Sequence, residues 1–115
     1  MENYFASRPF FYARWDEAAR EHAAVGISPR NQAARDGFLR DVKPNVPLIR
    51  EGLAQVAAPV LLYVGALDPF VTEVAARAAA QEFSDAVVVV QPDAGHYPWI
   101  DDPEAFTAVL AGFLG

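Results

Sequence analysis

Two continuous apolar runs mark the second half of the chain, at residues 60–64 and 86–90. Neither run alternates with polar residues, which is typical of parallel strands that helices cover on both faces. The alanine-rich stretch 71–83 lies between them and has the composition of a helix, with Thr72 as its expected N-cap. The pattern therefore predicts one β-α-β unit with parallel strands and a right-handed crossover.

Apolar residues recur at helical spacing in the first 57 residues, which predicts an all-helical segment of three helices. The first is expected from about Arg14, and Pro9 is expected to interrupt any regular element before it. The second is expected at about 29–42 and the third at about 47–56. Their apolar stripes are predicted to be Trp15, Ala18, Ala19 and His22, then Ala33, Ala34, Phe38 and Leu39, then Leu48, Ile49, Leu53 and Val56.

A last helix is predicted after Asp102, which is its expected N-cap, with Pro103 in the first helical position. Its buried face is expected to consist of Phe106, Val109, Leu110, Phe113 and Leu114. The whole pattern predicts an α/β fold in one small domain, in which a helical segment at 1–57 precedes a β-α-β-α unit at 58–115.

Composition narrows the range of partners. The chain has 115 residues, 53% of them hydrophobic, and its net charge of −6 argues against nucleic acid and against acidic lipid surfaces. The absence of cysteine excludes disulfides and thiolate chemistry, and the two histidines, His22 and His96, lack metal-ligand spacing. No membrane span or secretory signal is expected, so a cytoplasmic location is the default.

Asp68 and His96 are the residues with the clearest chemical potential. Asp68 follows the first predicted strand and His96 follows the second, so parallel strands would bring both to one edge of the sheet. Neighbouring strands lie about 4.8 Å apart, which allows the carboxylate to hydrogen-bond the imidazole and fix its tautomer. Taken singly, an Asp-Pro is often a turn residue or a helix cap, and a Gly-His is often a solvated or structural histidine. Their joint placement favours a site.

The segment 59–69, Pro-Val-Leu-Leu-Tyr-Val-Gly-Ala-Leu-Asp-Pro, resembles the strand and acid of the α/β-hydrolase superfamily. The segment 94–99, Ala-Gly-His-Tyr-Pro-Trp, with the following 102–106, resembles its histidine loop and last helix. The resemblance implies that Asp68 is the acid and His96 the base of a nucleophile–acid–histidine triad. It also implies a partial α/β-hydrolase fold in which residues 10–57 resemble a helical cap. The implied reaction is hydrolysis of a small apolar ester or related substrate, without a metal or organic cofactor.

The sequence departs from that family at the nucleophile. No G-x-S-x-G occurs, Ser7, Ser28 and Ser84 lack that context, and the Gly-rich oxyanion loop is absent. The chain is therefore expected to be the C-terminal half of a hydrolase, inactive alone, whose nucleophile comes from a second chain or an N-terminal half. The alternative is a non-catalytic remnant or interaction module that binds a partner through its open sheet edge. Either way, a two-stranded sheet predicts a chain that is marginally stable, oligomeric or prone to aggregation.

Several other residues are secondary candidates. Phe70, Tyr97, Trp99 and Trp15 are expected to contribute to substrate binding. Simple packing is the alternative for Tyr97, Trp99 and Trp15, and Phe70 is the weaker candidate. His22 is expected to be a packed or half-exposed helix residue. The acidic cluster near the last helix is attributed to the dipole at the helix N-terminus. That cluster comprises Asp101, Asp102 and Glu104.

Overall fold

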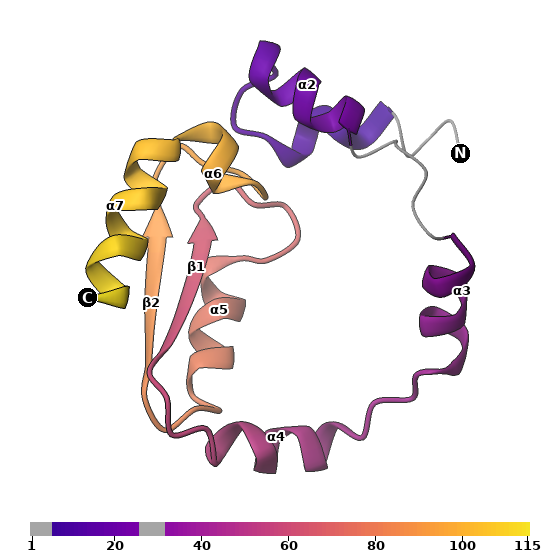
Figure 1. The fold of residues 1–115 in the computed structure, drawn as a ribbon, viewed down its shortest axis with the longest axis vertical. Helices are drawn as coiled ribbons and strands as arrows, with labels where there is room; N and C mark the ends of the chain where they lie inside the picture. The colour runs from indigo at the N-terminus through magenta and orange to yellow at the C-terminus, as the bar shows by residue number, and fades with distance from the viewer. Residues whose placement is uncertain (1–5, 26–31) are drawn as a thin grey trace.

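Two parallel strands, β1 (Val60–Gly65) and β2 (Ala86–Gln91), form the sheet of this chain (Figure 1). The structure is a computed structural model that describes residues 6–25 and 32–115. The strands are paired in register along their whole length, and α5 (Glu73–Ala80) connects them and packs on both. The predicted β-α-β unit is thereby confirmed.

The crossover helix α5 begins as predicted. The side chain of Thr72 accepts a hydrogen bond from the Ala75 N–H at 3.2 Å, which satisfies one of the unpaired amides of the first turn. Ala76 is the buried residue of this helix. Its small side chain allows the helix to approach the strands closely.

Two helices follow β2: the short α6 (Pro98–Asp101) and α7 (Pro103–Leu114). The sequence pattern predicted α7 with its Asp102 cap and Pro103 start, but it missed α6. Figure 1 shows α7 and α5 on either side of the strand pair. The contact with α7 includes an edge-to-face pair between Phe106 and Tyr63 of β1, whose ring centroids are 5.1 Å apart. Leu114, expected in the buried face, is 76% exposed at the last residue of the helix.

The N-terminal helices begin differently from the prediction. A 3-10 helix, η1 (Arg8–Phe11), contains Pro9, so the expectation that this proline interrupts regular structure was wrong. Proline is tolerated there because amides in a first helical turn have no helical partner to lose. The helix α2 (Glu17–Val25) starts later than Arg14, since Asp16 Oδ1 accepts the Ala19 N–H at 3.0 Å and caps it.

A small cluster joins α2 to α6 and the residue that precedes it. Its buried members are Tyr12, Ala19 and Ala23, with Tyr97 and Ile100 packed against them. His22, on the same helix, is half-buried and its Nδ1 lies 2.8 Å from the Tyr12 hydroxyl, as expected for a packed histidine. Trp15 precedes the helix and is exposed, so it does not contribute to a helical stripe.

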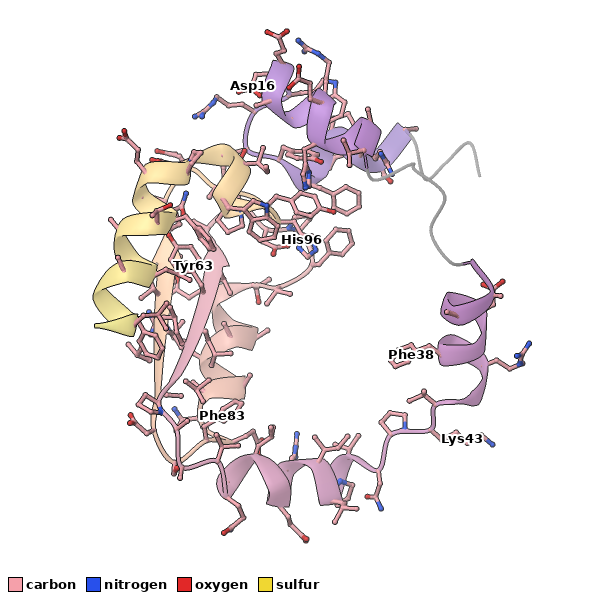
Figure 2. All side chains as sticks on the ribbon, viewed as in Figure 1. Asp16, Phe38, Lys43, Tyr63, Phe83 and His96 are labelled. Carbon is pink, nitrogen blue, oxygen red and sulfur yellow. The ribbon has the colours of Figure 1, made fainter. Side chains whose placement is uncertain are left out.

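The helices α3 (Gln32–Asp41) and α4 (Val46–Ala54) curve away from the sheet in an arc (Figure 1). The predicted start of the second helix lies outside the described residues. The stripes expected on these helices are largely unburied: Phe38 is 65% exposed, and Leu48 is exposed as well. Figure 2 shows Phe38 well apart from the aromatic side chains gathered around His96. Helical periodicity predicted these elements correctly, but it presupposed a packing partner that the described residues do not provide.

The hydrophobic core is thin. Among the described residues, no large side chain is completely buried, and the buried apolar set is Tyr12, Ala19, Ala23, Val64, Ala76 and Ala94. Many large apolar side chains on α3, α4 and α5 remain exposed. The marginal stability expected for the isolated chain stays a prediction, and these exposures give it a structural reason.

Candidate functional site

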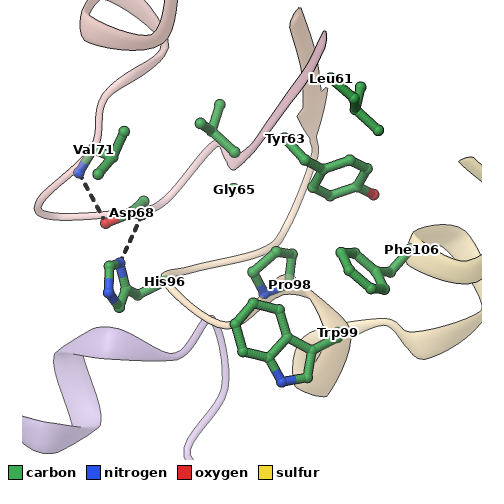
Figure 3. Close-up of a pocket in the computed structure, with 10 residues that line it drawn as sticks. Leu61, Tyr63, Gly65, Asp68, Val71, His96, Pro98, Trp99 and Phe106 are labelled. Atoms are coloured by element: carbon green, nitrogen blue, oxygen red, sulfur yellow. Dashed lines mark hydrogen bonds and ion pairs between the residues drawn. The ribbon is translucent and has the colours of Figure 1, made fainter. Parts of the chain in front are cut away.

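Asp68 and His96 meet at the carboxyl edge of the sheet. Asp68 lies in the loop that leaves β1, and His96 lies in the loop that leaves β2. Asp68 Oδ2 is 2.9 Å from His96 Nδ1, within hydrogen-bond distance (Figure 3). The expectation that parallel strands bring these two side chains together is confirmed, while their catalytic role stays a prediction.

The carboxylate of Asp68 has fixed partners on both oxygens. Oδ1 accepts the N–H groups of Phe70 at 2.8 Å and Val71 at 3.1 Å, and Oδ2 faces His96. The side chain is 6% exposed. Asp68 therefore stabilises the turn after β1, as an Asp-Pro often does, and is also the partner of the imidazole.

The pKa of Asp68 lies below its ordinary value. Desolvation of the carboxylate is the largest single influence and raises the pKa. The hydrogen bonds from the Phe70 N–H, His96 and the Val71 N–H, with the charge of a protonated His96, together outweigh it. Asp68 is consequently ionised at neutral pH and can only accept hydrogen bonds.

An ionised Asp68 determines the tautomer of His96. Because the carboxylate is acceptor-only, Nδ1 must carry the proton, which leaves Nε2 with its lone pair. The His96 side chain is 35% exposed, and no residue in the described part of the chain bonds to Nε2. This nitrogen is available to take a proton from another group, as a general base does.

Two glycines allow the histidine loop to reach this position. A Cβ on Gly65, at the end of β1, would lie 2.2 Å from the carbonyl oxygen of Gly95, so only glycine lets strand and loop approach so closely. A Cβ on Gly95 would lie 2.6 Å from the carbonyl oxygen of Phe11. The loop is thus packed between β1 on one side and residues 11–13 on the other.

A pocket of about 360 Å³ opens beside the pair. Figure 3 shows Asp68 and His96 on one side of it and Tyr63 and Phe106 on the other. Burial and the charge of Asp102 raise the pKa of the Tyr63 hydroxyl, which donates to Gln91 Oε1 and stays protonated at neutral pH. The lining residues are Leu61, Tyr63, Val64, Gly65, Asp68, Val71, His96, Pro98, Trp99 and Phe106. A mostly apolar lining with one acid–imidazole pair suits a small apolar ligand that presents one polar reacting group.

Comparison with known proteins identifies the family. Residues 1–109 match the family described as "Alpha/beta hydrolase family". The chain belongs to this family. It is also 37% identical over 65 residues to the pimeloyl-[acyl-carrier protein] methyl ester esterases of Pectobacterium atrosepticum and Pectobacterium carotovorum subsp. carotovorum. Each match covers 56% of this chain and 26% of the relative, so the chain spans about a quarter of the length of the relatives it matches.

Neither serine that the structure describes has the family's nucleophile context. Ser84 precedes β2, and its hydroxyl donates to the Val56 carbonyl at 2.8 Å. It therefore lies at the opposite end of the strand from His96, roughly 20 Å away from the strand rise alone. Ser7 is the N-cap residue of η1, and Ser28 lies outside the described residues.

The four predicted substrate-binding residues fall in different places. Trp99 lines the pocket, whereas Phe70, Tyr97 and Trp15 lie outside its lining. Phe70 stacks on Phe11 at 4.7 Å and contacts the His96 ring edge-on. The ring of Tyr97, the next residue in the chain, packs against the ring of His96, and Trp15 lies against Tyr12. The substrate-binding role of all four stays a prediction.

Asp101 is the residue that sequence reasoning misjudged. It was grouped with Asp102 and Glu104 as a response to the helix dipole, but it is buried, at 6% exposure. Asp102 alone caps α7, through a 3.0 Å bond from the Ala105 N–H. Asp101 instead accepts the Gly95 N–H at 2.7 Å. The sequence did contain a signal for this role: one carboxylate suffices to cap a helix, so the neighbouring aspartate needed another explanation.

No group of three or more His, Cys, Asp or Glu side chains in residues 6–25 and 32–115 is arranged to hold a metal ion. None of the helices in those ranges is long and apolar enough to cross a membrane.

Proposed function

We propose that Asp68 and His96 are the acid and the base of a nucleophile–histidine–acid triad in an ester hydrolase. The observation that carries the proposal is the 2.9 Å bond between Asp68 Oδ2 and His96 Nδ1 beside an apolar pocket. The bond orients the ring so that Nε2 is the basic nitrogen, which is the role of the acid in such triads. Membership of the hydrolase family supports the same assignment.

In the proposed reaction, Nε2 of His96 takes the proton of the nucleophile as the nucleophile attacks the ester carbonyl. Asp68 keeps the Nδ1 proton in place and stabilises the imidazolium that forms. The imidazolium then returns the Nε2 proton to the leaving alcohol as the bond from the acyl carbon to that oxygen breaks. Water, activated by the same nitrogen, releases the acid and restores the nucleophile.

The nucleophile and the oxyanion donors are proposed to come from residues outside this sequence. What supports this is the lack of G-x-S-x-G in the sequence and the position of Ser84 at the far end of the sheet. On this proposal the 58–115 unit supplies acid and base, and the 1–57 segment is the cap-like part. The placement of Phe11 and Tyr12 beside the histidine loop supports a covering role for the beginning of that segment.

The proposed substrate is a small, largely apolar ester. The pocket volume lies near the lower end of the range for small-molecule sites, and its walls are formed largely by Leu61, Val71, Pro98, Trp99 and Phe106. The relatives are named for a methyl ester, which favours an ester over an amide as the first compound to test. The identity of the acyl group is left to that test.

The test compares hydrolysis of a short methyl ester and a chromogenic ester by this chain alone and with a nucleophile-bearing polypeptide. That polypeptide would be sought in upstream DNA as a reading frame containing G-x-S-x-G. We expect background hydrolysis by the chain alone, since it lacks the nucleophile and the oxyanion hole, and strong hydrolysis by the combination.

Hydrolysis that is unchanged in His96→Ala would refute the assignment. Tight binding of the second polypeptide with no hydrolysis would instead favour the interaction module, which uses the sheet edge and leaves His96 without a chemical role.

A further inference from the structure

Three segments that are distant in sequence converge on the carboxylate of Asp101. Its Oδ2 accepts the Gly95 N–H at 2.7 Å, and both of its oxygens lie 3.1–3.2 Å from the Ala13 nitrogen. The main-chain carbonyl of Asp101 accepts a hydrogen bond from Arg14 Nη2 at 2.8 Å. One buried residue of α6 therefore binds both the histidine loop and the stretch that precedes α2.

The amide next to Gly95 completes the connection. The His96 N–H donates to the Phe11 carbonyl at 2.7 Å. Two consecutive amides of the loop thus have different partners. The Gly95 N–H is held by Asp101, and the His96 N–H by Phe11, whose segment Asp101 also holds through the Ala13 N–H. Fixing both amides fixes the backbone from which the imidazole extends, and so the direction of Nδ1 toward Asp68.

We propose that Asp101 is a positioning residue for His96, and that its buried carboxylate holds the loop and residues 11–13 so that the imidazole stays on Asp68. The proposal rests on the proposed function only for its catalytic meaning, because the geometry it describes exists in this chain without a substrate. The same contact places the Phe11 ring beside His96 and Phe70, with centroid distances of 6.0 Å and 4.7 Å.

A carboxylate is the group that this position requires. Two backbone N–H donors point at it, and an ionised carboxylate accepts on both oxygens without offering a hydrogen of its own. Asparagine has the same shape, but its amide would direct N–H against one of the two donors. A bond from an N–H to a charged acceptor is also stronger than one to a neutral acceptor, which compensates for burying the charge.

The test uses the full chain and two variants, Asp101→Asn and Asp102→Asn. Asp102 is the matched control because it is the adjacent aspartate and also accepts a backbone N–H, but at the exposed start of α7. The first readout is the tautomer of His96, read from its ring ¹⁵N shifts. The second is the hydrogen-exchange protection of the Gly95, His96 and Ala13 amides. Both variants remove one negative charge near the loop, so a change seen only in Asp101→Asn reports the lost contacts and not the lost charge.

We expect the wild-type chain to hold His96 as the Nδ1–H tautomer, with the three amides protected together. Asp101→Asn should reduce their protection by about tenfold to a hundredfold, the range for losing a hydrogen bond to a charged group, and yield a mixture of tautomers. Asp102→Asn should leave both readouts unchanged. Unchanged readouts in Asp101→Asn, or equal changes in both variants, would overturn the proposal.

The wild-type measurement keeps the test decisive if Asp101→Asn does not fold. Gly95 and His96 amides that exchange as fast as those of exposed loops would show that Asp101 holds nothing in place. Neither readout measures hydrolysis, so failure of the ester assay would refute the proposed function without touching this proposal, and the reverse also holds.

Discussion

The substitution Asp68→Asn tests the pairing with His96 while preserving the turn around it. Asparagine keeps an Oδ1 that can accept the Phe70 and Val71 N–H groups, which lie at 2.8 Å and 3.1 Å in the native chain. The other side-chain atom becomes an NH₂ group facing the Nδ1–H of His96. The imidazole must then turn away or change tautomer, so that Nδ1 accepts and Nε2 carries the proton.

The expected cost follows from the one bond that is lost. A hydrogen bond to a charged group contributes about 1.5–3 kcal/mol. The partial exposure of His96 lowers this contribution to roughly 1–2 kcal/mol. Urea denaturation at pH 7 should show this decrease in the free energy of unfolding. The matched control is Asp93→Asn, an exposed aspartate in the loop that leaves β2 and carries His96. Asparagine also tolerates its φ of 54°.

The same comparison has a defined dependence on pH. Because the pKa of Asp68 is lowered in the folded chain, its stabilising effect is present above the unfolded carboxyl pKa of about 3.9. It is lost as the pH falls through the folded pKa. The difference between wild type and Asp68→Asn should therefore be complete at pH 6–7 and close on acidification below about pH 4. Equal unfolding free energies at pH 7, or a difference that acid leaves unaltered, would refute this reasoning.

Three further changes follow from the structure. Gly65→Ala should destabilise the chain by about 3 kcal/mol or more in urea denaturation, since its Cβ would lie 2.2 Å from the Gly95 carbonyl oxygen; a loss under 1 kcal/mol would contradict the close approach. Thr72→Ala should lower the free energy of unfolding by about 1 kcal/mol, because α5 loses its N-cap; an unchanged free energy would mean that the cap does not stabilise the chain. In an enzyme supplied with its nucleophile, Trp99→Ala should raise KM for apolar esters more than it lowers kcat; an unchanged KM would remove Trp99 from substrate binding.

The sequence was most informative where local pattern and topology suffice. Uninterrupted valine-rich runs separated by a helix determined the parallel pair, and parallel strands alone brought Asp68 and His96 to one edge. Asp68 lies three residues beyond the end of β1 and His96 five beyond the end of β2, so the order of strands and loops was enough to predict that they share an edge. The family resemblance rested on the same two segments.

Several of the contacts that were missed depend on the N-terminal stretch folding back. Nothing local to Asp101 indicates that the Ala13 amide, 88 positions away in sequence, will reach it. The stripes of α3 and α4 were equally beyond local reasoning, because a helical period indicates an apolar face without showing what covers it. The exposed Phe38 is the clearest case. The division into a cap-like segment and a β-α-β-α unit stays a prediction.

The most direct test of the central claim is the kcat/KM of His96→Ala for a short methyl ester, measured in the assembly of this chain with the nucleophile-bearing polypeptide. Wild type and Asp93→Asn should hydrolyse the ester equally well. His96→Ala should be slower by at least about 10³-fold, because the nucleophile loses its base. A His96→Ala enzyme within tenfold of wild type would contradict the assignment of His96 as the base.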